Sequence, residues 1–193
     1  MRKLLLIPVM ALISLTLSAQ SLPPELPPHL EGNVTYPVFD FNPFVGVINT
    51  ENTALNYDPD LTYKVVIDVY NRVQDSSRLH MALFSAARTY NLIIANGVPQ
   101  ENVHMAIIVH GGAVNALLTE EEYKKKYHVS NPNLEPISMM KQAGVNFYVC
   151  GQNLGFLNLP QSSITKDVEV TLSAKTTIIT LDQMGYTYMN LSE

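Results

Sequence analysis

Short runs of apolar residues along the later two thirds of the chain predict buried β-strands. The clearest runs are 63–69 and 103–109, where nearly every central position is apolar, as in strands that are buried on both faces. A third run occupies 145–149. The run 168–172 alternates apolar and polar residues, which favours a more exposed strand, and a last strand is predicted at 185–191.

Between these runs, apolar residues recur every three or four positions, which is the period of an amphipathic helix. The longest such stretch is 75–96, and Gly97 suits its C-terminal cap. Further helices are predicted from Thr119, over 131–143 and over 173–184. Strands that alternate with helices imply βαβ units, so the sequence predicts an α/β fold with an open, mainly parallel sheet of about five strands and helices on both faces.

Residues 1–19 have the layout of a secretory signal peptide. Arg2 and Lys3 precede an apolar stretch that ends in small residues at Ala19. The alternative is a membrane anchor, but this stretch is short for the roughly 20 residues that span a bilayer. We expect cleavage after Ala19 and a secreted protein, periplasmic if the source is Gram-negative. No later stretch is long enough to span a membrane.

Residues 20–62 hold seven of the 12 prolines, which makes long helices improbable there. We expect an extended segment that precedes a domain at 63–193. The stretch 36–44 carries three phenylalanines and a tyrosine, which are costly to expose. It is expected to lie against the domain or against a neighbouring subunit.

Composition removes several classes of function. The net charge is −5, and no basic stripe of the kind that nucleic-acid binders carry is evident. The single cysteine, Cys150, excludes an internal disulfide, a CxxC redox pair and a multi-cysteine zinc site. It also lies far from the cleavage point, which excludes a lipoprotein anchor. The histidines lack the spacing of metal ligands, so we expect no metal and no cofactor.

Candidate chemistry gathers where the predicted strands end. His110 follows the second strand, Cys150 the third and Lys175 the fourth. The carboxyl ends of parallel strands meet at one edge of a sheet, and ligands bind outside that edge. The three side chains are therefore expected near one crevice, although their contacts depend on the strand order.

Cys150 stands at a predicted strand-to-helix turn, where free backbone N–H groups favour a thiolate. Gly151 and Gln152 are candidate backbone donors to that anion, with His110 or Lys175 as auxiliary groups. The alternative is an inert, buried structural cysteine, because free cysteine is among the most buried residues. The two interpretations stay open at this point.

His110 is a candidate for orienting a ligand or taking a proton, and the alternative is a strand-end histidine that bonds the backbone. Gly111 and Gly112 permit close approach of another backbone. They form neither a G-x-G-x-x-G nor a P-loop pattern, so they do not indicate a nucleotide. The sequence has no G-x-S-x-G motif to suggest a hydrolase.

Several segments resemble the DsrE/DsrF-like family, which includes YchN and sulfur-relay proteins, and in particular its secreted bacterial members. The matching segments are YKVVIDV at 63–69, ANGVPQENVHMAIIVHGGA at 95–113, NPNLEPI at 131–137, AGVNFYVCGQNL at 143–154 and DVEVTLSAKTTIITLDQMGY at 167–186. The most specific parts are the VHG triplet and the VCGQ segment. The resemblance covers nearly all of 63–193.

This resemblance implies a three-layer α/β/α fold and homo-oligomers, often trimers or hexamers. In the sulfur-relay members, a cysteine at the position of Cys150 accepts sulfur as a persulfide and passes it on. His110, Gly111 and Gln152 match family positions whose role is less defined. Many relatives carry an Arg-Gly pair near the end of the short helix after the cysteine, and this chain has Leu157-Asn158 there.

Two functional hypotheses follow. The first is a sulfur carrier or transferase-type protein, rather than a turnover enzyme, that holds sulfane sulfur on Cys150 and exchanges it with a donor or acceptor protein or a polysulfide. The second is a non-catalytic, oligomeric binding or scaffold protein that keeps the fold without the chemistry. The secreted location, the missing Arg-Gly pair and the aromatic N-terminal segment motivate the second. The lone cysteine at a strand end, within the VCGQ match, places the first slightly ahead.

Overall fold

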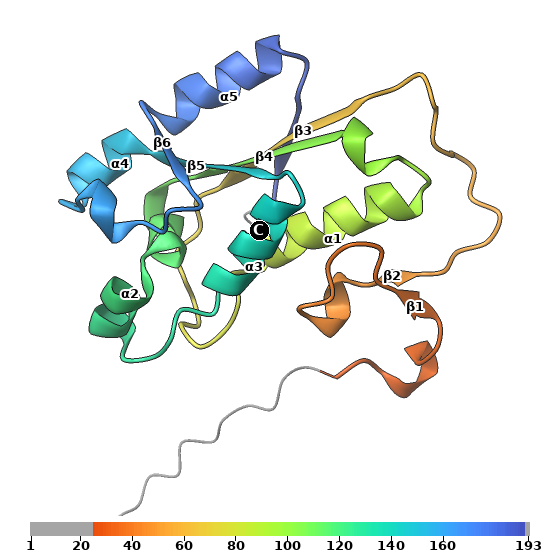
Figure 1. Cartoon of the computed structure of the whole chain (residues 1–193), viewed down its shortest axis with the longest axis horizontal. Helices are drawn as coiled ribbons and strands as arrows, with labels where there is room; N and C mark the ends of the chain where they lie inside the picture. Colours follow the sequence, from red (N-terminus) through yellow and green to blue (C-terminus); the bar gives the residue numbers. More distant parts are fainter. Residues whose placement is uncertain (1–24, 192–193) are drawn as a thin grey trace, which may run out of the picture.

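A five-stranded parallel sheet organises the molecule in the computed structural model, which describes residues 25–191 (Figure 1). The strands are β3 (Tyr63–Val69), β4 (Val103–Val109), β5 (Asn146–Cys150), β6 (Glu169–Thr171) and β7 (Thr187–Asn190). Their spatial order is β6-β5-β4-β3-β7, and every neighbouring pair is parallel. The predicted α/β fold and its number of strands are confirmed.

The central strands form because their residues can be buried on both faces. Positions 65–69 and 105–109 are all buried. Val109 pairs with Val69 on one side and with Val149 on the other, and Cys150 pairs with Thr171. The carboxyl ends of β3, β4, β5 and β6 are therefore level with one another, which collects the residues that follow them at one edge.

Helices cover both faces, but unequally (Figure 1). On one face, α1 (Met81–Ala95) packs against β4 and α3 (Leu134–Gln142), within the larger hydrophobic core. On the other face, α5 (Ala174–Gln183) lies across β3, β4, β5 and β7 over a smaller apolar cluster. Two short helices, α2 (Glu120–Tyr127) and α4 (Gly151–Phe156), lie beyond the carboxyl ends of the strands. The result is a three-layer arrangement.

The predicted start of the long helix was wrong. Helix α1 begins at Met81 rather than at Asp75, and the side chain of His80 caps it by accepting a hydrogen bond from the Ala82 N–H at 3.3 Å. The carboxylate of Asp75 instead accepts hydrogen bonds from the backbone and hydroxyl of Ser77. Such local bonds offer the backbone an alternative to the helix. Residues 70–80 therefore form a loop at the carboxyl edge of the sheet.

The N-terminal segment joins the main core rather than running fully extended. The chain reverses between β1 (Val34–Thr35) and β2 (Val47–Ile48), which pair antiparallel, through a 3₁₀ turn at Pro43–Val45 (η2). Phe39 is fully buried, and its ring lies 5.2 Å from that of Tyr90 on α1. The segment thus covers part of the outer face of α1.

Asn91 of α1 holds this segment in place. Its side-chain oxygen accepts hydrogen bonds from the N–H groups of Val38 and Phe39, at 3.2 and 3.0 Å. Its amide nitrogen donates to the carbonyls of Phe39 and Val45, at 2.8 and 2.9 Å. Asn91 is fully buried, so each of its hydrogen-bonding atoms depends on these partners.

The predicted signal peptide, residues 1–19, lies outside the described residues. Between residues 25 and 191, no helix combines the length and apolarity that crossing a membrane requires.

We expect Asn91→Ala to lower the free energy of unfolding by about 3 kcal/mol, because it leaves buried backbone groups of the N-terminal segment without partners. Urea unfolding followed by circular dichroism measures the change. Arg88→Ala, at an exposed position of the same helix, is the control and should stay within about 0.5 kcal/mol of the wild type. Equal losses in the two variants would contradict the role assigned to Asn91.

Candidate functional site

Cys150 is the last residue of β5 and directly precedes α4. It is only 5% exposed and is a free cysteine. It belongs to the smaller apolar cluster under α5, which also contains Val66, Ile108 and Ala174. No hydrogen bond joins its sulfur to another residue of the described part of the chain. The thiol is therefore enclosed on the α5 side of the sheet, next to its carboxyl edge.

Gly151 allows the neighbouring strand to pass close to the cysteine. A Cβ atom at this position would lie 2.7 Å from the carbonyl oxygen of Thr171, at the end of β6. Real Cβ atoms do not approach an oxygen so closely, so a larger residue would push the ends of β5 and β6 apart. Gln152 follows on the exposed side of α4.

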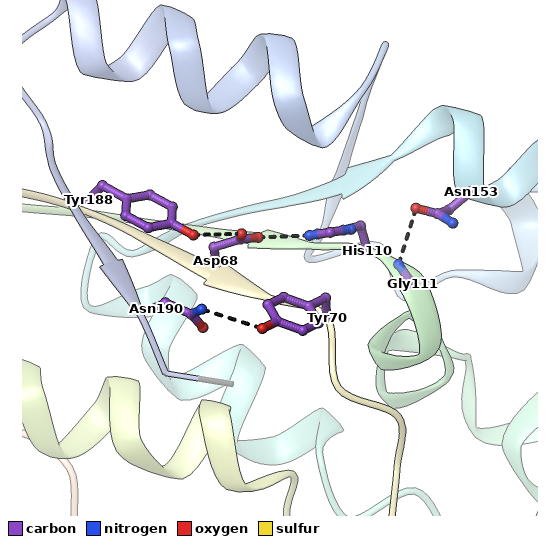
Figure 2. Close-up of polar contacts among 7 residues, drawn as sticks. All are labelled: Asp68, Tyr70, His110, Gly111, Asn153, Tyr188 and Asn190. Atoms are coloured by element: carbon purple, nitrogen blue, oxygen red, sulfur yellow. Dashed lines mark hydrogen bonds and ion pairs between the residues drawn. The ribbon is translucent and has the colours of Figure 1, made fainter. Parts of the chain in front are cut away.

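His110 has a different partner from the one expected. Its Nε2 lies 2.8 Å from Oδ1 of Asp68, and Oδ2 of Asp68 accepts a hydrogen bond from the hydroxyl of Tyr188 at 2.9 Å. Figure 2 shows the carboxylate between these two side chains. Since β4 lies between β3 and β5, the bond to Asp68 turns the ring toward β3 and away from Cys150.

Asp68 and Tyr188 are the residues that the sequence analysis missed. Asp68 lies within the apolar run of β3, and only 11% of its side chain is exposed. A carboxylate in a buried strand needs hydrogen-bond donors. The presence of an aspartate within an apolar run was therefore the sequence signal that could have indicated a polar site. Tyr188 comes from β7, so recognising its part required the strand order.

These three side chains form a polar chain from Tyr188 through Asp68 to His110. Burial raises the pKa of Tyr188 above 10.0, and the hydrogen bond to Asp68 and the charge of that carboxylate raise it further. Tyr188 thus remains a neutral donor. With a neutral imidazole, the bond to Asp68 favours the tautomer that carries its proton on Nε2, which leaves Nδ1 as an acceptor. The arrangement can hold a proton and fix the direction of the ring.

The aromatic ring of Tyr70 and the side-chain amide of Asn190 border this polar chain. The Tyr70 ring lies 5.6 Å from the His110 ring, and the Asn190 amide donates to the Tyr70 hydroxyl at 3.4 Å (Figure 2). Tyr70 thereby covers one side of His110, and β3, β4 and β7 all contribute to the surroundings of this histidine.

Gly111 and Gly112 bring the loops after β3 and β4 together. Gly111 has a positive φ of 56°, and its N–H donates to the side chain of Asn153 in α4 at 3.1 Å (Figure 2). A Cβ atom at Gly112 would lie 2.6 Å from the Cβ of Arg72. The close backbone approach predicted for this glycine pair is therefore present, and it sets the position of Arg72.

The structure does not gather all the predicted auxiliary groups around the thiol. Lys175 is exposed in the first turn of α5, and its ammonium makes no ion pair or hydrogen bond with any described residue. Among residues 25–191, no group of three or more histidines, cysteines or acidic residues could hold a metal ion.

Two hollows at this edge lie beside the 70–80 loop. One, of about 360 Å³, is lined by Tyr70, Asn71, Arg72, Gln74 and Gly112. A second, of about 210 Å³, extends along the same loop toward Arg78, the start of α1 and Leu191. The edge is thus divided into an enclosed thiol, a polar chain and an open hollow.

Comparisons with known proteins agree with this architecture. Residues 64–191 match the profile of the DsrE/DsrF-like family. Among solved structures, the chain is similar to MTH1491 from Methanobacterium thermoautotrophicum, described as a protein of unknown function, with 20% identity and a TM-score of 0.50. The match covers 66% of this chain and 98% of that one. A sequence search of curated proteins gives no match. The structural similarity therefore supports the fold alone.

We expect Gly112→Ala to lower the free energy of unfolding by about 1–3 kcal/mol, because the added methyl group collides with Arg72. Gly155→Ala is the matched control. A Cβ at Gly155 meets nothing within 4 Å, and alanine is the better helix former by roughly 0.5–1 kcal/mol, so this variant should be at least as stable as the wild type. Chemical denaturation measures both, and an unchanged Gly112→Ala protein would show that the contact is not tight.

We expect Asp68→Asn to lower the pKa of Tyr188, because it removes the negative charge beside the hydroxyl. NMR of the protein with isotope-labelled tyrosine rings gives this pKa in an alkaline titration, with the signal assigned from Tyr188→Phe. Asp182→Asn, exposed on α5, removes the same charge and should leave the pKa unchanged. Since folding raises this pKa, the stability that Tyr188 contributes is present below pH 10.0 and is lost as the pH rises through the folded-state pKa.

Proposed function

Because the chain belongs to the DsrE/DsrF-like family, we propose that it handles sulfane sulfur, which it carries as a persulfide on Cys150. The observation that supports this role most directly is the position of the chain's single cysteine, at the carboxyl end of an inner strand of a parallel sheet. This edge is where α/β proteins of open-sheet type bind their ligands. The family resemblance seen in the VCGQ segment includes the same residue.

The proposed transfer is a thiol exchange that needs no external oxidant. The thiolate of Cys150 attacks the outer sulfur of a donor persulfide or polysulfide, and a new S–S bond forms while the bond within the donor breaks. The donor leaves as a thiolate or a shortened polysulfide, which takes the displaced electron pair. An acceptor thiolate then attacks the sulfur held on Cys150 and regenerates the cysteine thiolate.

The enclosure of Cys150 favours a small donor. At 5% exposure, the sulfur is accessible to a slender chain of sulfur atoms more readily than to the folded surface of another protein. The apolar cluster to which Cys150 belongs suits a polarizable, weakly hydrated sulfur chain better than a strongly hydrated ion. We therefore assign an inorganic polysulfide, or a small organic persulfide, as the donor.

The proposal includes the location predicted from residues 1–19. A chain that is secreted and then cleaved would carry sulfur outside the cytoplasm, in the periplasm of a Gram-negative source. It would do so as a homo-oligomer, the state that the family resemblance implies.

A second candidate function is a non-catalytic oligomeric scaffold. The same burial of Cys150 supports it, because a cysteine in an apolar cluster without a hydrogen-bond partner in the described structure fits a packing role. Exposed apolar side chains occur on α4, directly after β6 and on α5, where Phe156, Leu172 and Ile179 are 87%, 74% and 61% exposed. A surface of this kind suits contact with another protein.

The two functions predict different results when the protein is incubated with polysulfide, because only the first adds sulfur to Cys150. We incubate the chain lacking residues 1–19 with polysulfide, block thiols and persulfides with an alkylating agent, and measure the intact mass. The sulfur-carrier role predicts a mass gain of one or more sulfur atoms, which a reducing agent reverses. Cys150→Ser has no cysteine at all and is the control that must show no gain.

A scaffold role predicts a different result. The native protein would gain no sulfur, although the same protein in denaturant would react with the alkylating agent at Cys150. That pair of results would reject the persulfide proposal, and a concentration-dependent oligomer in light scattering would then support the scaffold.

A further inference from the structure

The hollow beside the 70–80 loop carries positive charge in a chain that is acidic overall. The net charge is −5, and the described residues include three arginines, Arg72, Arg78 and Arg88. Arg72 lines both hollows at the carboxyl edge of the sheet, and Arg78 lines the second. Two of the three described arginines thus border the hollows beside this loop.

The glycine at position 112 allows Arg72 to lie beside this hollow. The absence of a side chain at Gly112 lets the Cα and Cβ atoms of Arg72 pack directly on the turn after β4, where an added Cβ would lie 2.8 and 2.6 Å from them. In the same way, a Cβ atom added at Gly111 would lie 3.0 Å from the carbonyl oxygen of Tyr70. The stem of Arg72 is therefore fixed by backbone packing, while its guanidinium makes no hydrogen bond or ion pair with any described residue.

The charges around the two hollows are unequal. No acidic residue lines the larger hollow, where the side chains of Arg72 and Gln74 both carry N–H donors. Asp75 lines the smaller one and lies 3.5 Å from Nε of Arg78, so the second arginine is largely offset by its own carboxylate. Of the two arginines that line these hollows, Arg72 is therefore the one without a carboxylate partner among the described residues.

We propose that the larger hollow is a binding site for a small oxyanion of the sulfate or phosphate type. The planar guanidinium of Arg72 matches two oxygens of such an anion with parallel hydrogen bonds. The amide of Gln74 is a neutral donor at the rim. A volume of about 360 Å³ accommodates a tetrahedral oxyanion, either free or as the end group of a small organic molecule.

This site is separate from the sulfur chemistry proposed above. Neither hollow is lined by Cys150 or by any member of the polar chain of Asp68, His110 and Tyr188. Binding of the oxyanion is accordingly expected to be the same in Cys150→Ser. Failure of either proposal leaves the other to be judged on its own result.

The test is calorimetric titration of the folded protein with sodium sulfate, phosphate and thiosulfate at constant ionic strength, against a sodium chloride baseline. We expect saturable binding of at least one oxyanion, and Arg72→Gln should weaken it by at least about tenfold because a charged, two-bond contact is lost. Arg88→Gln removes the same charge from an exposed position on α1 outside both hollows and should bind like the wild type.

Two further variants make the test independent of folding. Asp75→Asn keeps the side-chain oxygen that accepts from Ser77 and removes a negative charge next to the site, so it should bind the oxyanion more tightly. Arg72→Lys keeps the charge without the planar fork and should bind with intermediate affinity. Preference for thiosulfate over sulfate and phosphate would identify a sulfur compound, and the reverse order a phosphate or sulfate group.

The proposal is overturned by either of two results. One is a response to all three oxyanions no greater than the response to chloride. The other is an equal loss of binding in Arg72→Gln and Arg88→Gln, which would mean that oxyanion binding depends only on the overall charge of the protein.

Discussion

The level register of four parallel strands is the constraint on which the rest of this molecule depends. Val69, Val109 and Val149 are paired across β3, β4 and β5, so the next residue of each strand emerges at the same height. A slip of one residue would move a strand's buried set to the opposite face. In β3, such a slip would take the carboxylate of Asp68 away from His110 and Tyr188 and toward the larger apolar core, which opposes it. The different residues buried on the two faces of the sheet thus decide which side chains meet at the edge.

That edge separates two kinds of chemistry that are close in space. Cys150 and Asp68 both lie on the α5 side of the sheet, one in apolar surroundings and the other bonded to His110 and Tyr188. A charged carboxylate in a buried strand is stable only with such donors. By engaging Asp68, the imidazole of His110 is directed away from the thiol. The same hydrogen bond therefore satisfies the carboxylate and leaves the cysteine among apolar groups.

Much of this architecture was predictable, because apolar periodicity is a local property of the sequence. All five strands and the parallel sheet follow from runs such as 63–69 and 103–109. The start of α1 was not predictable from periodicity, because the hydrogen bonds that Ser77 donates to the carboxylate of Asp75 compete with the helix. The partners of His110 were not predictable either. They depend on β7 lying next to β3, a choice made by packing over 120 residues of sequence rather than by any local pattern.

The bond between Tyr188 and Asp68 also has a consequence for the order in which the molecule is completed. During synthesis, β3, β4 and β5 leave the ribosome well before β7, so a growing chain already contains Asp68, His110 and Cys150 while Tyr188 is still missing. The carboxylate then lacks the donor that Tyr188 supplies, and β3 has an unpaired edge on the side where β7 later adds. The final orientation of the histidine is therefore a property of the finished chain. A nascent intermediate would have the thiol in place before the neighbouring polar groups are set.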